Sequence, residues 1–195
     1  MMNNIIRKAL LSLIALLGLF RICQCMVSAG QDYVVTNDQL IPLEVEGMII
    51  DFSHLETIGR QHLVNGSLII LDDLDDDNFG FTVEMYTSPN GDGDYKKMAM
   101  DVPRTQVCEG FKKFYKEFVQ PSFTYGENSN IPYIDDDGLC PIPAGEYYIK
   151  EIEFNTDAWP NQMPRGTLKV VVTFFKGDDV VGGLTALLKI EDDTR

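Results

Sequence analysis

Hydrophobic and polar residues alternate along several short segments of this chain, which is the pattern of half-buried β-strands. Segments 62–71 and 80–88 are rich in β-branched and aromatic residues, and an acidic turn separates them. Segment 166–176 and the last strand of the chain each place every second side chain on one apolar face. These side chains are Leu168, Val170, Val172 and Phe174, followed by Leu184, Ala186, Leu188 and Ile190. Short strands separated by turn residues predict a mainly β fold of the sandwich or barrel type.

Three further segments carry a weaker strand pattern. Segment 94–102 places Met98 and Met100 on one face, and segment 32–58 holds one or two strands, best seen at 48–52. Segment 145–155 is expected to form a strand whose apolar face consists of Tyr148, Ile152 and Phe154.

One segment has helical rather than strand periodicity. Between Pro103 and Val119 apolar residues recur three to four positions apart, at Val107, Phe111, Phe114, Tyr115 and Phe118. Pro103 suits the first turn of a helix, and Asp101 could cap it. We expect a helix packed on the sheet, with its aromatic side chains in a common core. The alternative is that these side chains line an apolar pocket between the helix and the sheet.

The first 29 residues have the layout of a secretory signal peptide. Arg7 and Lys8 precede the apolar stretch Ala9 to Phe20, and small residues follow up to Ala29. The apolar stretch is shorter than the roughly 20 residues that a membrane-spanning helix needs. We expect cleavage after Ala29, with cleavage after Cys25 as the alternative, and therefore a secreted, extracellular protein with one domain at 30–195.

Removal of this segment would leave Cys108 and Cys140 as the only cysteines. In an exported chain two cysteines most simply form one disulfide bond. Asn65-Gly66-Ser67 is the only N-x-S/T sequence, so Asn65 is a candidate glycosylation site. The alternative is that Asn65-Gly66 forms a two-residue hairpin turn.

Charge and motifs exclude several classes of function. The chain carries 30 acidic against 16 basic residues, a net charge of −14, which disfavours binding to nucleic acids or anionic membranes. Asp73, Asp75, Asp77 and Glu84 have the spacing of a calcium loop, but Asn78 replaces the required glycine. We therefore expect solvated acidic turns and no metal site. No motif for nucleophilic catalysis, phosphate binding or dinucleotide binding is present, so we expect a non-enzyme without a cofactor.

The segment from Cys140 to Tyr148, CPIPAGEYY, resembles the C-P-x-P-x-G-x-Y signature of a large insect family of secreted proteins, known as domain of unknown function 1091. The order of landmarks is also similar: a cysteine opening a helix, this motif, a Pro-Gly loop and a final hairpin. That family is similar to the chemosensory CheB proteins and to ML-type, ganglioside-activator-like lipid-recognition domains. The resemblance implies an immunoglobulin-like β-sandwich whose sheets can part to hold an apolar ligand.

Two functional hypotheses follow from these observations. The first is a secreted binding protein that holds or presents a hydrophobic small molecule, a lipid or semiochemical, with a protein receptor as a further partner. Its candidate pocket residues are Met98, Met100, Phe111, Phe114, Tyr115 and Phe118. The second is an extracellular interaction protein that has a solid core and acts through its acidic surface.

Overall fold

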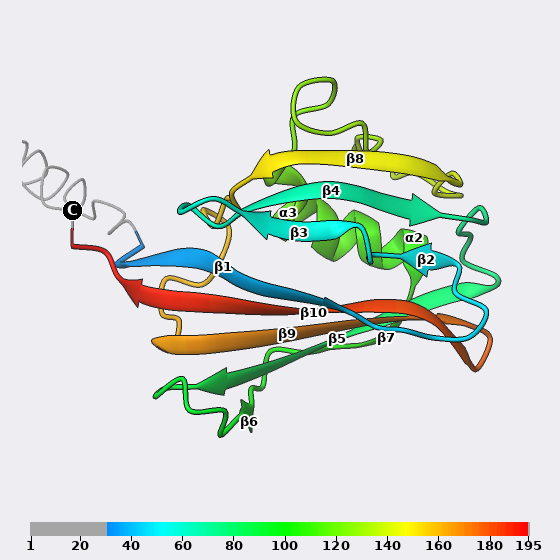
Figure 1. Ribbon diagram of the computed structural model, residues 1–195. Coiled ribbons are helices and arrows are strands. Elements are labelled where there is room, and N and C mark those ends of the chain that lie inside the picture. Colours follow the sequence, from blue (N-terminus) through cyan, green and yellow to red (C-terminus); the bar gives the residue numbers. More distant parts are fainter. Residues whose placement is uncertain (1–30, 195) are drawn as a thin grey trace, which may run out of the picture.

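The computed structural model describes residues 31–194 (Figure 1). The predicted signal peptide, with Cys23 and Cys25, lies outside the described residues. None of the helices among residues 31–194 is long and apolar enough to cross a membrane.

Strands dominate the described chain. In sequence order they are β1 (Tyr33–Pro42), β2 (Ile50–Asp51), β3 (Leu55–Ile58), β4 (Leu63–Ile70), β5 (Phe79–Ser88), β6 (Lys96–Lys97), β7 (Val102–Gln106), β8 (Gly145–Ile152), β9 (Gly166–Lys176) and β10 (Asp179–Asp192). One helical segment interrupts them, made of α2 (Val107–Gly110), the π-helical η1 (Phe111–Tyr115), α3 (Lys116–Phe118) and the 3₁₀ turn η2 (Gln120–Ser122). The predicted mainly β class with one helix is confirmed.

The strands form an open sheet that folds into two layers. Strands β1, β10, β9 and β5 make the larger layer, with β6 and β7 along the free edge of β5, and β3, β4 and β8 make the smaller one (Figure 1). The short strand β2 pairs with both β10 and β4 and so joins the two layers. The finer prediction, an immunoglobulin-like or ML-type sandwich, stays a prediction.

The strand faces of the larger layer agree with the predicted alternation. Phe174 and Phe81 are cross-strand neighbours in β9 and β5 and are buried at one end of the layer. Leu168 and Leu188 pair across β9 and β10 and are buried at the other end. The two pairs belong to different clusters of buried residues, one toward each end of the layer.

The helix begins later than the sequence pattern predicts. Val102–Gln106, including Pro103, forms the edge strand β7 beside β5, and the helix starts at Val107. Asp101 does not cap the helix, because its carboxylate pairs with Lys97 at 3.5 Å. Proline is tolerated in an edge strand, where its missing N–H costs no ladder hydrogen bond.

In the smaller layer, the predicted apolar face of β8 is wrong, and the alternative of a hairpin turn at Asn65-Gly66 is also wrong. Glu151 in β8 has a positive φ of 51°, and this irregularity shifts the alternation, so Tyr147, Ile149 and Ile152 are buried while Tyr148 is 38% exposed. Asn65-Gly66 is not a hairpin turn, because both residues lie inside β4. A Cβ atom at Gly66 would overlap the backbone oxygen of His54, which explains the glycine. Asn65 itself is partly exposed and stays a candidate glycosylation site.

Candidate functional site

The helical segment carries its aromatic side chains to the interior surface of the larger layer. Phe111 contacts Phe81 at a ring-centroid distance of 5.8 Å and Phe174 at 6.4 Å. Gly110 permits this approach, since a Cβ atom there would overlap the ring of Phe81. Phe111 is therefore a packed residue that fixes the helix on β5 and β9.

Tyr115 follows Phe111 by one turn and continues the aromatic stack. Its ring lies 4.9 Å from that of Phe111 and 6.3 Å from that of Phe123. Burial raises the pKa of the Tyr115 hydroxyl well above its ordinary value. The turn Phe111–Tyr115 is π-helical, and single π turns inside helices occur frequently at functional sites.

The other four candidate pocket residues have different surroundings. Phe114 packs against the same buried cluster as Phe111, and Met98 packs against the cluster at the opposite end of the sheet. Phe118 is partly accessible, and its carbonyl accepts a hydrogen bond from the indole of Trp159 at 3.3 Å. Met100 is 36% exposed in the loop after β6, which places it apart from the helix aromatics in the fold.

The centre of the inner sheet surface is partly accessible, in contrast to its ends. Val172 of β9 pairs with Val83 of β5, and Val170 pairs with Met85. These two apolar cross-strand pairs lie between the buried residues Phe174 and Leu168 of β9. All four are partly accessible, although they pack against the buried clusters. Leu168 and Phe174 are six residues apart, about 20 Å along the strand. The accessible rows thus lie between two sealed ends. We call these four residues the inner rows.

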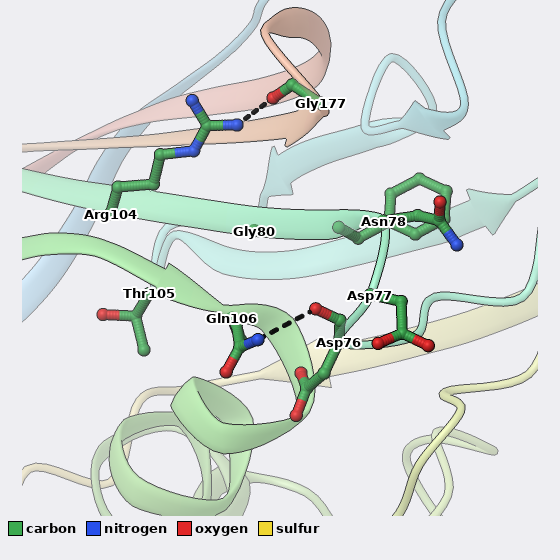
Figure 2. A pocket seen from close by; sticks show the side chains of 9 residues that line it. Asp76, Asp77, Asn78, Gly80, Arg104, Thr105, Gln106 and Gly177 are labelled. Atoms are coloured by element: carbon green, nitrogen blue, oxygen red, sulfur yellow. Dashed lines mark hydrogen bonds between the residues drawn. The ribbon is translucent and has the colours of Figure 1, made fainter.

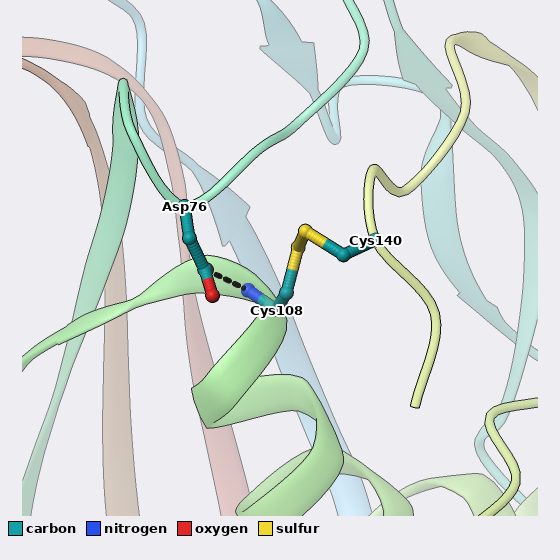
Figure 3. Close-up of side chains that lie close together, drawn as sticks. All are labelled: Asp76, Cys108 and Cys140. Carbon is teal, nitrogen blue, oxygen red and sulfur yellow. Dashed lines mark hydrogen bonds between the residues drawn. A yellow bond between two sulfur atoms is a disulfide. The ribbon is translucent and has the colours of Figure 1, made fainter. Parts of the chain in front are cut away.

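A disulfide bond and a carboxylate hold the start of the helix. Cys108 and Cys140 are bonded, as predicted, which ties α2 to the segment preceding β8 (Figure 3). Asp76, from the turn before β5, accepts a hydrogen bond from the Cys108 N–H at 2.7 Å. Within residues 31–194 the only cluster of three potential metal ligands is Asp76 with these cysteines. Both sulfurs are committed to the disulfide bond, so this cluster is structural.

Two other acidic side chains of this turn, and Glu84 in β5, also bind the chain itself. Asp73 accepts the N–H of Ala144 at 2.7 Å, and Asp75 accepts the backbone N–H groups of Asp77 and Asn78. Glu84, the last position of the calcium-loop spacing, forms an ion pair with Lys97 at 2.7 Å, and this hydrogen bond lowers the pKa of the Glu84 carboxyl. These carboxylates therefore organise the acidic turn and the entry to β8.

Removal of the Asp76 carboxylate should destabilise the helix start. In Asp76→Ala we expect a loss of about 1–2 kcal/mol in the free energy of unfolding, because the first helical turn loses its side-chain acceptor. Asp77→Ala, which removes the same charge from an exposed neighbour, is the matched control and should change stability by less than about 0.5 kcal/mol. Urea unfolding of both variants measures this difference, and equal losses would contradict the capping role.

A polar surface depression of about 220 Å³ lies beside this turn (Figure 2). Its lining side chains bind the protein's own backbone: Arg104 donates to the carbonyl of Gly177, and Gln106 donates to that of Asp76 at 3.1 Å. The Arg104 guanidinium also lies over the ring of Phe175 at 4.6 Å. The contacts of Arg104 join β7 to the β9–β10 turn. The side chains that line the depression therefore stabilise the fold.

Sequence reasoning missed two features of the region under the helix. The inner rows were available from strand alternation, but their partial accessibility depends on how far the second layer and the helix stand from the sheet. The capping role of Asp76 was hidden, because Asp76 and Cys108 are 32 residues apart.

Comparison with known proteins gives one finding. A family model described as "Protein of unknown function (DUF1091)" matches residues 81–170, from near the start of β5 to the middle of β9. The match spans the helix, both cysteines and the segment Cys140 to Tyr148, and it supports the DUF1091 family. A search of curated proteins finds no match.

Proposed function

We propose that this protein is a secreted, non-enzymatic binding protein that holds a hydrophobic small molecule between the helical segment and the larger layer of its sheet. The observation that carries this proposal is the partial accessibility of the inner rows Val83, Met85, Val170 and Val172, which lie between fully buried ends of the same surface. Apolar side chains that remain accessible beneath a covering layer favour a space that an apolar ligand can fill.

The helical segment supports this proposal as the cover of such a space. Phe111 anchors it near one end of the layer, and the hydrogen bond from Trp159 to the Phe118 carbonyl anchors its other end. Trp159 packs against the buried cluster around Leu168. The helix therefore runs from one buried end of the inner surface toward the other.

One further observation favours a bound ligand over the alternative of an acidic interaction surface. Asp73, Asp75 and Asp76 accept hydrogen bonds from the protein's own backbone, which reduces their availability to a basic partner. The disulfide bond suits an exported protein. The resemblance to CheB and ML-type domains implies a lipid or semiochemical as ligand and a protein receptor as further partner.

Uptake of a fluorescent hydrocarbon tests the proposal. The oxidised protein should bind diphenylhexatriene with saturable enhancement of fluorescence. Val170→Trp should abolish this uptake while the protein stays folded, because the indole would occupy the space beneath the helix. Val171→Trp is the matched control: Val171 is the next residue of β9 and lies on the opposite face, so uptake should persist.

A solid interior predicts the opposite pattern. An inserted indole in a close-packed core costs roughly 1–3 kcal/mol or more and leaves no room for a probe. If wild-type protein takes up no diphenylhexatriene and Val170→Trp unfolds, the binding proposal is wrong. The interaction-protein hypothesis then replaces it.

A further inference from the structure

Asn65 lies inside β4, a strand with neighbours on both sides, yet the fold makes no use of its side chain. Asparagine is depleted in strands, so its presence there requires an explanation. Within residues 31–194 no hydrogen bond or ion pair involves the Asn65 amide. Most other asparagines of the described chain do use their side-chain amides in hydrogen bonds, namely Asn37, Asn78, Asn90, Asn128, Asn130 and Asn155.

The side chains of Asn65 and Ser67 point away from the interior of the protein. Val64 is buried and Leu68 packs against the buried clusters, so the even-numbered residues of this part of β4 face inward. Side chains alternate between the two faces of a strand, which places Asn65 and Ser67 together on the outer face. The neighbouring strand agrees, because Glu56, opposite Asn65 in β3, is exposed. The Ser67 hydroxyl, like the Asn65 amide, has no side-chain partner in the described part of the chain.

Tyr148 places an exposed aromatic ring on the same outer face. It pairs with Ser67 across β4 and β8, and its chain neighbours Tyr147 and Ile149 are buried on the inner face. The Tyr148 side chain is 38% exposed. Asn65, two residues before Ser67, is therefore a diagonal neighbour of Tyr148, at the roughly 7–8 Å from which long side chains still make contact.

We propose that Asn65 carries an N-linked glycan whose first sugar packs on the ring of Tyr148 and covers the outer face of the smaller layer. The modification uses the amide of Asn65 and the hydroxyl two residues later, which are the two side chains left free here. The middle residue of the motif is explained by the fold, because a Cβ atom at Gly66 would overlap the backbone oxygen of His54. The fold explains neither of the flanking residues.

The glycan is transferred from an oligosaccharide linked to a lipid diphosphate. Nδ2 of Asn65 loses one proton and bonds to C1 of the first sugar, while the bond between C1 and the diphosphate oxygen breaks and the lipid diphosphate leaves. This donor belongs to the secretory route, so the inference rests on the export that is part of the proposed function. It goes beyond that function, because it assigns a covalent modification and closes one face of the protein to partners.

Secretion of matched variants from cultured eukaryotic cells tests the modification. The intact mass of secreted wild type should include N-acetylhexosamine and hexose units, and peptide N-glycosidase should remove them and convert Asn65 to aspartate in the peptide map. Ser67→Ala should be secreted without these sugars, although it keeps Asn65. Ser67→Thr is the matched control and should retain them, because a threonine hydroxyl also completes the motif.

Thermal unfolding tests the contact with Tyr148. Wild type with its glycan should melt about 2–4 °C above the enzymatically deglycosylated protein, because removal of the sugar exposes the ring again. In Tyr148→Ser this difference should fall below about 1 °C. Tyr133→Ser, at a tyrosine that is 66% exposed and lies outside β8, is the matched control and should keep the full difference.

The outcomes separate this inference from the proposed function. If the protein is retained inside the cell, export is wrong and this inference fails with it. If the protein is secreted and takes up diphenylhexatriene but Asn65 is unmodified, this inference is wrong and the proposed function stands. If Asn65 is modified but deglycosylation shifts the melting temperature of wild type and Tyr148→Ser equally, the contact with Tyr148 is wrong.

Discussion

Replacement of both cysteines, Cys108→Ala with Cys140→Ala, should lower the free energy of unfolding by about 3–4 kcal/mol. The bond links residues 32 positions apart, and closing a loop of this length restricts the unfolded chain by about that amount. In the folded protein the same bond holds the first turn of α2, where Cys108 is buried. Urea unfolding of the double variant and of the oxidised wild type measures the difference.

Reduction of the wild-type protein provides the control for this prediction. Reduction breaks the S–S bond and leaves every heavy atom of the wild-type side chains in place. The loss of stability on reduction should therefore match that of the double variant. A loss below about 1 kcal/mol in both samples would contradict the role of the bond as the main tether of the helix.

Phe111→Ala should be the most destabilising single truncation in the helical segment, with an expected loss of about 3–5 kcal/mol. Phe111 has three aromatic ring contacts, with Phe81, Phe174 and Tyr115, and its removal leaves a hole between the helix and the sheet. Phe118→Ala should cost clearly less in ligand-free protein, because Phe118 packs against none of the buried clusters and has fewer contacts to lose.

The comparison of the two variants also separates packing from ligand contact. Phe118→Ala should remain folded and take up diphenylhexatriene more weakly than wild type, since it removes apolar surface from a candidate pocket residue. Thermal unfolding and probe titration of both variants give the required pair of values. Equal destabilisation, with no change in uptake by Phe118→Ala, would place Phe118 in an ordinary packed core.

Strand alternation was sufficient to assign the inner faces of two central strands of the larger layer. The inner faces of β9 and β10 follow a strict period of two, so Leu168 to Phe174 and Leu184 to Ile190 could be assigned from sequence. The same reasoning failed in β8, where Glu151 adopts a positive φ and shifts the alternation. Such an irregularity depends on pairing with β4, and a single strand's sequence does not show it.

The helix and the acidic turn show where local patterns give incomplete predictions. The aromatic spacing identified the helix, but pairing of β7 with β5 overrides helix formation at Pro103. The acidic run suggested solvated turns, whereas Asp73 and Asp76 bind backbone N–H groups 71 and 32 residues away. Long-range hydrogen bonds of this kind depend on the folded topology. The cysteine pair was predictable because composition leaves one simple pairing.

The central claim, an apolar ligand held between the helical segment and the inner rows, is tested most directly by a crystal structure of the protein soaked with a terminally brominated dodecanol. The account predicts one anomalous bromine peak beside Val83, Met85, Val170 and Val172. Bromine only on the outer surface, for example near the exposed Leu71, together with inner rows closed by neighbouring side chains, would contradict it.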